Sequence, residues 1–274
     1  MPSPDLNKRS RKPIVLVFGG HDPSGGAGIA ADISTLLALG CHPAVVITAV
    51  TVQNTQEVSG YRLLEPDIIE AQAKALLDDM QIGAFKTGML GSAEIVKAVA
   101  GAMATAPHIP VVVDPVMSAD RGGTLGDRDL VTALQTDLLP RATLITPNVD
   151  ECLRLSAPHD QELDQAARGL LGLGCKAVLL TGTHAPTTTI IHRLYQASTD
   201  QIGTSEWPRL EGIYHGSGCT LAAAAAANLA LGMQTEAAVN SALGYVWQAL
   251  NHAYTAGRGQ YIPDRLWRMR QLAP

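Results

Sequence analysis

Short apolar runs rich in β-branched residues alternate with longer stretches of helical periodicity along most of the chain. The apolar runs cover residues 14–18, 45–52, 84–86, 111–114, 143–146 and 177–181, and each is followed by Gly, Pro, Asn or Asp. Helical patterns are expected between them, near residues 26–39, 66–80, 92–104, 127–137 and 161–172. Because parallel strands need crossover connections, this order predicts βαβ units and a mostly parallel sheet with helices on both faces.

The pattern changes after residue 182. Residues 187–194 and about 201–207 are typical of an antiparallel pair, which would extend the edge of the sheet. Two helices are then expected, roughly at 217–231 and 235–255. No repeat or linker interrupts the pattern, so we expect an extended or disordered tail at 1–12 and a single domain at 13–274, built as a three-layer α/β/α sandwich.

Charge and composition exclude several classes of protein. The 274 residues carry 20 Lys and Arg against 25 Asp and Glu, a formal net charge of −5, which argues against a general nucleic-acid binder. The longest Ala- and Leu-rich stretch, residues 221–231, is too short to cross a membrane. The four cysteines have no Cys-x-x-Cys spacing, so neither a disulfide framework nor a zinc site is expected. These features predict a soluble, cytoplasmic protein.

A glycine-rich turn follows the first predicted strand. The sequence GGHDPSGGAGI at residues 19–29 opens a helix, and such a turn lets backbone N–H groups approach a ligand closely. Gly26 stands where a Walker P-loop would have Lys, and the exact Gly-x-Gly-x-x-Gly pattern is absent. A purely structural turn is the alternative.

A second cluster of small residues, HGSGCT at residues 215–220, precedes the Ala-rich helix. The N–H groups of Gly216, Ser217, Gly218 and Cys219, together with the positive end of the helix dipole, predict an anion hole for a phosphoryl group. The same field is expected to lower the pKa of the Cys219 thiol. A Ser-capped helix with a buried Cys is the alternative.

Carboxylates follow two further predicted strands. Asp114 ends one strand, and Asn148 and Glu151 come just after another. Asp114 and Glu151 could hold Mg²⁺ through water against nucleotide phosphates, because hard cations prefer oxygen ligands. A helix-capping interaction between Asn148 and Glu151 is an equally good interpretation of this spacing.

Taken together, the motifs resemble the hydroxymethylpyrimidine/phosphomethylpyrimidine kinase family of the ribokinase-like superfamily over nearly the whole chain. The motifs are GHDPSGGAGIAAD (20–32), TAVTVQNT (48–55), KTGML (86–90), DPVM (114–117), TPNVDE (146–151) and HGSGCT (215–220). The resemblance implies ATP-dependent, Mg²⁺-assisted phosphorylation of 4-amino-5-hydroxymethyl-2-methylpyrimidine and of its monophosphate, in thiamine biosynthesis. It also implies a homodimer, which an edge hairpin would suit.

The resemblance implies roles for individual residues as well. Gly20, Asp32, Gln53 and Met89 would line the pyrimidine pocket; Asp114, Asn148 and Glu151 would face Mg²⁺ and the ATP phosphates; Thr181 and Gly182 would meet the nucleotide. Cys219 would be the catalytic residue, either taking the proton of the acceptor hydroxyl as a thiolate or orienting that hydroxyl. Because only 4% of the residues are aromatic, the pyrimidine pocket is expected to rely on Met89, Gln53 and backbone.

The chain departs from the family pattern at three places. Thr181 stands where family members commonly have Lys, Tyr214 replaces the usual Thr before the His, and the flap after Met117 carries Arg121 instead of Lys. Two alternatives therefore stay open, namely a pyridoxal or pyridoxine kinase and a non-catalytic protein that binds a vitamin precursor.

Overall fold

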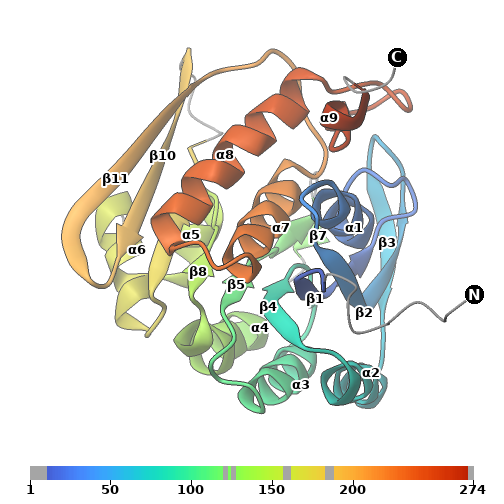
Figure 1. Ribbon diagram of the computed structural model, residues 1–274, viewed down its shortest axis with the longest axis vertical. Helices are drawn as coiled ribbons and strands as arrows, with labels where there is room; N and C mark the ends of the chain where they lie inside the picture. Colours follow the sequence, from blue (N-terminus) through green and yellow to red (C-terminus); the bar gives the residue numbers. More distant parts are fainter. Residues whose placement is uncertain (1–10, 120–122, 125–127, 157–161, 183–187, 271–274) are drawn as a thin grey trace, which may run out of the picture.

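The computed structural model describes residues 11–119, 123–124, 128–156, 162–182 and 188–270. In this part of the chain one sheet has the strand order β11-β10-β9-β8-β5-β4-β1-β2-β3 (Figure 1). Its parallel strands are β1 (Ile14–His21), β2 (His42–Gln53), β4 (Ile82–Thr87), β5 (Val111–Val113), β8 (Leu144–Ile145) and β9 (Ala177–Leu180). Each of them corresponds to an apolar run in the sequence, so the predicted parallel sheet is confirmed.

The central strand β1 is apolar on both faces. Val15 and Val17 pack into one hydrophobic core, whereas Leu16 and Phe18 pack into the other. All four side chains have no exposed surface. Because successive side chains of a strand point to opposite faces, an uninterrupted apolar run of this kind fits only a sheet that is covered on both sides.

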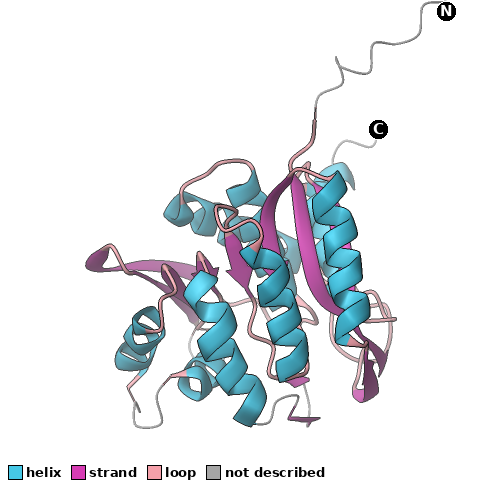
Figure 2. Ribbon diagram, turned by 90° about the horizontal axis from the view of Figure 1, so that it is seen from below, coloured by secondary structure: helices cyan, strands magenta, loops and turns pink. Residues whose placement is uncertain are grey.

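Helices cover both faces of the sheet, as Figure 2 shows. The core on one face is built by α1 (Gly28–Ala38), α7 (Ser217–Ala230) and α8 (Thr235–Asn251). The core on the other face is built by α2 (Pro66–Asp79), α3 (Ala93–Ala104), α4 (Arg128–Ala133), α5 (Val149–Leu155) and α6 (Leu163–Gly172). The predicted three-layer sandwich is confirmed, and a short helix, α9 (Trp267–Arg270), follows near the end of the chain.

The two edges of the sheet are antiparallel. At one edge, β10 (Thr189–Gln196) and β11 (Thr199–Pro208) form the expected hairpin, although residue 187 of the predicted strand lies outside the described residues. At the other edge, β3 (Val58–Leu63) pairs with β2. The sequence did not indicate β3, because this short strand is exposed at half of its positions and lacks a buried apolar run.

Three further segments differ from the sequence expectations. The predicted helix at 127–137 becomes α4, a π-helical turn at Leu134–Leu138 and a 3-10 turn at Leu139–Arg141, where Pro140 cannot donate a backbone hydrogen bond. The flap after Met117 forms a small hairpin of β6 (Ser118–Ala119) and β7 (Gly123–Thr124). Arg121 of this flap, and residues 1–10 of the expected tail, lie outside the described residues.

Helix α7 runs through the middle of its layer. Its alanines 222–227 have no exposed surface, and their small side chains let the helix approach the sheet closely. Gly83 of β4 shows how close this approach is, because a Cβ atom there would lie 3.3 Å from the Cβ atom of Ala230. No helix in the described part of the chain is both long and apolar enough to span a bilayer.

Candidate active site

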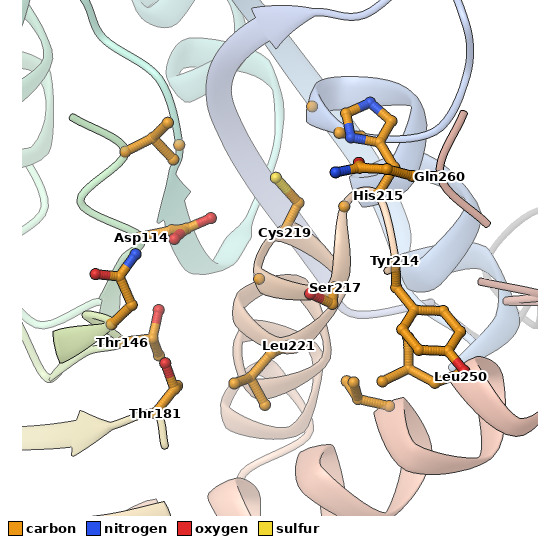
Figure 3. A pocket seen from close by; sticks show the side chains of 18 of the residues that line it. Asp114, Thr146, Thr181, Tyr214, His215, Ser217, Cys219, Leu221, Leu250 and Gln260 are labelled. Carbon is orange, nitrogen blue, oxygen red and sulfur yellow. The ribbon is translucent and has the colours of Figure 1, made fainter. Parts of the chain in front are cut away.

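A cavity of about 570 Å³ opens where the parallel strands end. Its wall includes Gly20 at the end of β1, Met89 after β4, Asp114 after β5, Asn148 after β8 and Thr181 after β9. This is the edge at which open α/β sheets bind ligands. In Figure 3, Asp114, Thr146 and Thr181 lie on one side of the cavity, across from Ser217 and Cys219 at the start of α7.

The glycine-rich turn after β1 is organised by one carboxylate. Asp22 is 3% exposed, and it accepts hydrogen bonds from the Ser24 N–H at 2.8 Å, the Ser24 hydroxyl at 2.9 Å and the Ala27 N–H at 2.8 Å. A fourth contact joins it to the His215 Nε2 atom at 2.8 Å. Burial raises the pKa of Asp22, but these hydrogen bonds outweigh burial and lower it to about 2. Asp22 therefore stays ionised and ties the turn to the loop before α7.

The contact between Asp22 and His215 holds Gly26 close to Gly216. Gly216, the N-cap of α7, has a φ of +78°, and a Cβ atom there would lie 2.1 Å from the Gly26 carbonyl oxygen. A Cβ atom on Gly26 would lie 2.3 Å from the His215 ring. Both positions therefore need glycine, because the turn after β1 and the start of α7 are packed backbone against backbone.

The start of α7 is the place where the sequence predicts an anion site. The N–H groups in the first turn of an α-helix have no acceptor within the helix, and the helix dipole adds positive potential there. Gly216, Ser217, Gly218 and Cys219 all line the cavity. The structure therefore brings these four residues together at one place, with Asp114 close by, since a Cβ atom on Gly218 would lie 3.9 Å from Asp114 Oδ1.

A buried ionic group lies in the same cavity wall. Lys86 Nζ is 3.0 Å from Asp32 Oδ2 and 3.9 Å from Asp114 Oδ2, and these three side chains are at most 6% exposed. Burial raises the pKa of Asp32 to about 6, although the Lys86 charge acts in the opposite direction. The predicted pyrimidine residue Asp32 does line the cavity, but one of its oxygens is already bound to Lys86.

The expected activation of Cys219 is wrong. Burial raises the pKa of the thiol to about 12, and the nearby Lys86 charge only partly offsets this effect. A hydrogen bond joins the Cys219 thiol to the Asp114 carboxylate. The Cys219 side chain is partly exposed to the cavity, but desolvation still outweighs the helix N-terminus, so Cys219 is a neutral thiol near pH 7.

Asn148 and Glu151 form the capping interaction that was one of the two interpretations of their spacing. The Glu151 N–H donates to Asn148 Oδ1 at 2.9 Å, and the Asn148 N–H donates to Glu151 Oε2 at 2.9 Å. These two bonds make a complete capping box at the start of α5. Both residues also line the cavity, so capping and ligand binding are compatible here.

The carboxylates at the strand ends match the ligand preference of a hard cation. Asp114 and Glu151 supply oxygen atoms on the same cavity, and Asp114 Oδ2 has no hydrogen-bond partner. Among the described residues no group of three or more His, Cys, Asp or Glu could hold a metal ion. A cation at this place would therefore depend on phosphate oxygens and water for the rest of its ligands.

Thr181 and Gly182 differ in what they do. Thr181 lines the cavity and donates from its hydroxyl to the Pro147 carbonyl oxygen at 3.3 Å. Gly182 is not part of the described cavity wall, and a Cβ atom on it would lie 2.0 Å from the Ile191 carbonyl oxygen. The glycine is thus explained by its packing against β10.

The other expected pyrimidine residues come together at one end of the cavity. Gly20, Gln53 and Met89 all line it, and a Cβ atom on Gly20 would lie 3.2 Å from the Met89 sulfur. The Gln53 side-chain oxygen accepts a hydrogen bond from the Thr51 hydroxyl at 3.1 Å, and its nitrogen lies 2.9 Å from His215 Nε2. This end therefore offers amide, imidazole and thioether groups to a small ring.

Another part of the cavity wall is apolar. It is lined by side chains of the β10–β11 hairpin and of α8, namely Ile190, Trp207, Leu243, Val246, Trp247 and Leu250. The two Trp rings lie 6.0 Å apart, centroid to centroid. The low aromatic content of the chain therefore does not leave the cavity without aromatic rings, because Trp207 and Trp247 both lie in this part of its wall.

Several residues of the site were missed by the sequence analysis. Lys86 and His215 stood inside quoted motifs without a role, and a buried Lys at the end of an apolar strand was an available signal for Lys86. Gln260 also lines the cavity, and Arg265 contacts the glycine-rich turn. Neither residue had a signal in the sequence, because both come from an irregular segment after α8 whose position depends on the whole fold.

Comparisons with known proteins agree with this geometry. Residues 22–264 match a family model described as phosphomethylpyrimidine kinase. Over 263 residues the chain is 40% identical to the hydroxymethylpyrimidine/phosphomethylpyrimidine kinase of Streptomyces coelicolor, and the match covers 93% of this chain and 95% of that protein.

Solved structures resemble the whole fold. The pyridoxal kinase from Staphylococcus aureus in complex with AMP-PCP and pyridoxal has a TM-score of 0.84 and 28% identity, with 95% of this chain and 96% of that chain covered. The phosphomethylpyrimidine kinase from Clostridium difficile has a TM-score of 0.75 and 32% identity, with 88% and 100% covered.

Proposed function

The chain belongs to the phosphomethylpyrimidine kinase family, and on this premise we propose that it phosphorylates hydroxymethylpyrimidine and then its monophosphate with ATP, in thiamine biosynthesis. The observation that carries the proposal is the position of the α7 N-terminus. Its residues Ser217 and Cys219 lie across the cavity from Asp114, and Gly20, Gln53 and Met89 line the same cavity.

The residues of the cavity suit an in-line transfer. In the first reaction the hydroxymethyl oxygen of the substrate bonds to the γ-phosphorus of ATP, the bond from that phosphorus to the bridging oxygen breaks, and ADP leaves. The first-turn N–H groups of α7 would stabilise the charge on the transferred phosphoryl group. In the second reaction an oxygen of the substrate's own phosphate takes the place of the hydroxyl.

Cys219 is assigned the orienting role rather than that of a thiolate base. A thiol with a pKa of about 12 holds its proton at neutral pH and donates it in a hydrogen bond to Asp114, so the Cys219 sulfur positions the acceptor hydroxyl by accepting its hydrogen bond. The hydroxyl proton leaves late, because the loose transition state of phosphoryl transfer needs little help from a base. Asp114, hydrogen-bonded to the thiol, is the carboxylate that we assign to accept it.

Mg²⁺ is part of the proposal. Asp114 and Glu151 would hold it, directly or through water, and when bound it neutralises charge on the ATP phosphates. Thr181 and the apolar wall with Trp207 and Trp247 are assigned to the nucleotide. Thr181 offers a hydroxyl where a Lys would offer a charge, so the phosphates depend more on α7 and on the cation.

An ATP-consumption assay with hydroxymethylpyrimidine, its monophosphate and pyridoxal offered separately tests the proposal. We expect turnover of both pyrimidines and little or none of pyridoxal. Turnover of pyridoxal alone would contradict the assignment and favour a vitamin B6 kinase. No turnover with any of the three, by a protein that binds them, would favour a non-catalytic binding protein.

We also propose that residues 13–274 act as a single kinase domain in the cytoplasm, where four free cysteines are chemically stable. A homodimer is proposed through the outer face of β2. Val50 and Val52 are 44% and 66% exposed on the face opposite Thr51 and Gln53, which line the cavity. Light scattering of wild type and of Val52→Glu tests this interface, and a dimer that survives the substitution would contradict it.

A further inference from the structure

The segment that follows α8 returns to the active site. In Figure 1 the red end of the chain lies beside α1 and the top of β3. The Gln260 N–H donates to the Thr55 carbonyl oxygen at 2.9 Å, and the His215 N–H donates to the Tyr261 carbonyl oxygen at 2.9 Å. These contacts hold the segment against the turn after β2 and against the loop that leads into α7.

One side chain of this segment enters the interior. Arg265 is 5% exposed, and its Nη2 donates to the Gly26 carbonyl oxygen at 2.5 Å, while its Nε donates to the Thr220 hydroxyl oxygen at 2.9 Å. The Thr220 hydroxyl in turn donates to the Gly216 carbonyl oxygen at 2.7 Å. The guanidinium group therefore joins the glycine-rich turn to the first turn of α7.

The fit around this group is tight. A Cβ atom on Gly216 would lie 2.9 Å from Arg265 Nη2 and 2.1 Å from the Gly26 carbonyl oxygen. Gly26, Gly216 and Arg265 are thus packed against one another directly behind the anion site. A shift of any one of them would move the N–H groups that face the cavity.

The surroundings of Arg265 are unusual for a buried cation. Both of its hydrogen-bond acceptors are uncharged oxygens, and no ion pair joins it to a carboxylate among the described residues. Buried charges are normally paired, because removing them from water is costly. Its charge interacts with the Asp32 carboxylate, which lines the cavity, so it adds positive potential on the side of the cavity where α7 begins.

We propose that Arg265 is a positioning residue for phosphoryl transfer, which fixes the α7 anion site through Gly26 and Thr220 and supplies positive charge behind it. The inference rests on the proposed kinase function. Because N–H donors of an anion site must lie within a few tenths of an ångström of their productive positions, loss of this support should slow the chemical step more than it weakens substrate binding.

Steady-state kinetics of Arg265→Gln test the proposal. We expect kcat to fall roughly 10- to 100-fold, with the KM for the pyrimidine and for ATP within about threefold of wild type. A folded variant whose kcat stays within twofold of wild type would overturn it. If Arg265→Gln does not fold, Arg265→Lys replaces it in the test. This variant keeps the charge but loses one of the two hydrogen bonds, so its kcat should fall by less. An unchanged kcat in Arg265→Lys would also overturn the proposal.

A matched control separates the guanidinium from the segment that carries it. The Tyr245 hydroxyl donates to the Arg265 carbonyl oxygen at 2.7 Å, so Tyr245→Phe loosens the same segment and leaves the guanidinium contacts in place. We expect its kcat to stay within twofold of wild type. An equal loss of kcat in Tyr245→Phe and Arg265→Gln would assign the effect to docking of the segment and overturn the proposal.

A double-mutant cycle tests the route through Thr220. Thr220→Val removes the acceptor of the Arg265 Nε bond, so its effect on kcat should be largely contained in that of Arg265→Gln. The double variant is expected to be no more than about threefold slower than Arg265→Gln alone. Fully multiplicative losses would rule this route out.

A measurement without turnover keeps this inference distinct from the proposed function. The Cys41, Cys152 and Cys175 side chains are at most 1% exposed, so a small thiol reagent such as methyl methanethiosulfonate should label Cys219 first. Inorganic phosphate bound at the α7 N-terminus should slow this labelling, and Arg265→Gln should need at least ten times more phosphate for the same protection. Equal protection would contradict the inference, even if wild type phosphorylated no pyrimidine.

Discussion

At the scale of single residues, burial decides chemistry more than neighbours in the sequence do. Cys219 lies at a helix N-terminus, which favours a thiolate, yet burial holds its pKa at about 12. Asp22 shows the opposite balance, since its hydrogen bonds outweigh burial and hold its pKa at about 2. Four hydrogen bonds favour the ionised form of Asp22, whereas at Cys219 the charges of Asp114 and Asp32 add to burial and only the Lys86 charge and one backbone hydrogen bond oppose it.

The first prediction concerns the pH dependence of kcat. If Cys219 orients the acceptor as a neutral thiol, kcat should show no ionisation of this group between pH 6 and 9, because its pKa lies near 12. Cys219→Ser should keep more activity than Cys219→Ala, which we expect to lose about tenfold in kcat. A basic limb with a midpoint near pH 7 or 8 that disappears in Cys219→Ala would indicate a thiolate base instead.

The second prediction concerns His192, which is 9% exposed and has an unpartnered Nδ1. Burial lowers its pKa from 6.5 to about 4. Between these values the unfolded chain binds a proton that the folded chain does not, so stability should fall as the pH drops from 6.5 towards 4, by up to about 3 kcal/mol.

Denaturant unfolding of His192→Phe as a function of pH measures this contribution. The variant should lose less stability than wild type over that window, because it has no group to titrate there. The exposed His42, replaced by Gln, serves as the control for removing one imidazole from the chain. Parallel curves for wild type and His192→Phe would contradict the prediction.

At the scale of elements, two helices, α5 and α7, begin at the cavity wall. α5 has seven residues and starts with a capping box whose two members both line the cavity. α7 starts at a left-handed glycine that is packed against the turn after β1. In both cases the interactions that start the helix also position groups on the cavity wall.

The third prediction concerns the capping box of α5, which both starts the helix and lies on the cavity wall. Asn148→Ala should cost about 1 kcal/mol of stability through the lost cap, and it should raise the KM for ATP severalfold, because the first turn of α5, which carries Glu151, loses the bond that holds the Glu151 N–H. Ser92→Ala removes the N-cap of α3, which accepts from the Ile95 N–H and lies outside the described cavity wall. The control should lose similar stability with an unchanged KM, and equal KM values in both variants would contradict the prediction.

At the scale of the whole molecule, segments far apart in the sequence close the cavity together. The turn after β2 is held by residues near 257–260, since the Gly259 N–H donates to the Thr55 hydroxyl oxygen at 3.1 Å. A Cβ atom on Gly259 would lie 1.9 Å from the Thr55 carbonyl oxygen, so the two backbones touch. The wall that carries Gln53 is thus supported by the end of the chain.

The fourth prediction tests this support. Gly259→Ala should push the segment away from the turn after β2, raising the KM for the pyrimidine about tenfold and speeding proteolysis near residues 54–57. Gly60→Ala on β3 is the matched control, because a Cβ atom there meets no atom within 4 Å. If Gly259→Ala keeps the KM and the protease resistance of Gly60→Ala, the end of the chain does not support this wall.

The sequence by itself determined the parallel sheet, the three layers and the places where the site motifs lie. These features follow from local patterns, because apolar runs must be buried on both faces and because glycine-rich turns come directly after strands. The exposed strand β3 and the seven-residue helix α5 escaped prediction, since neither carries a long apolar pattern.

Only the tertiary structure decided the electrostatics of the site. The ion pair of Lys86 with Asp32 joins residues 54 positions apart, and Arg265 reaches Gly26 across 239 positions. The raised pKa of Cys219 likewise depends on what covers the thiol. Desolvation and ion pairing depend on distances in space that no local pattern contains, so the sequence located the chemistry and the fold fixed its charge states.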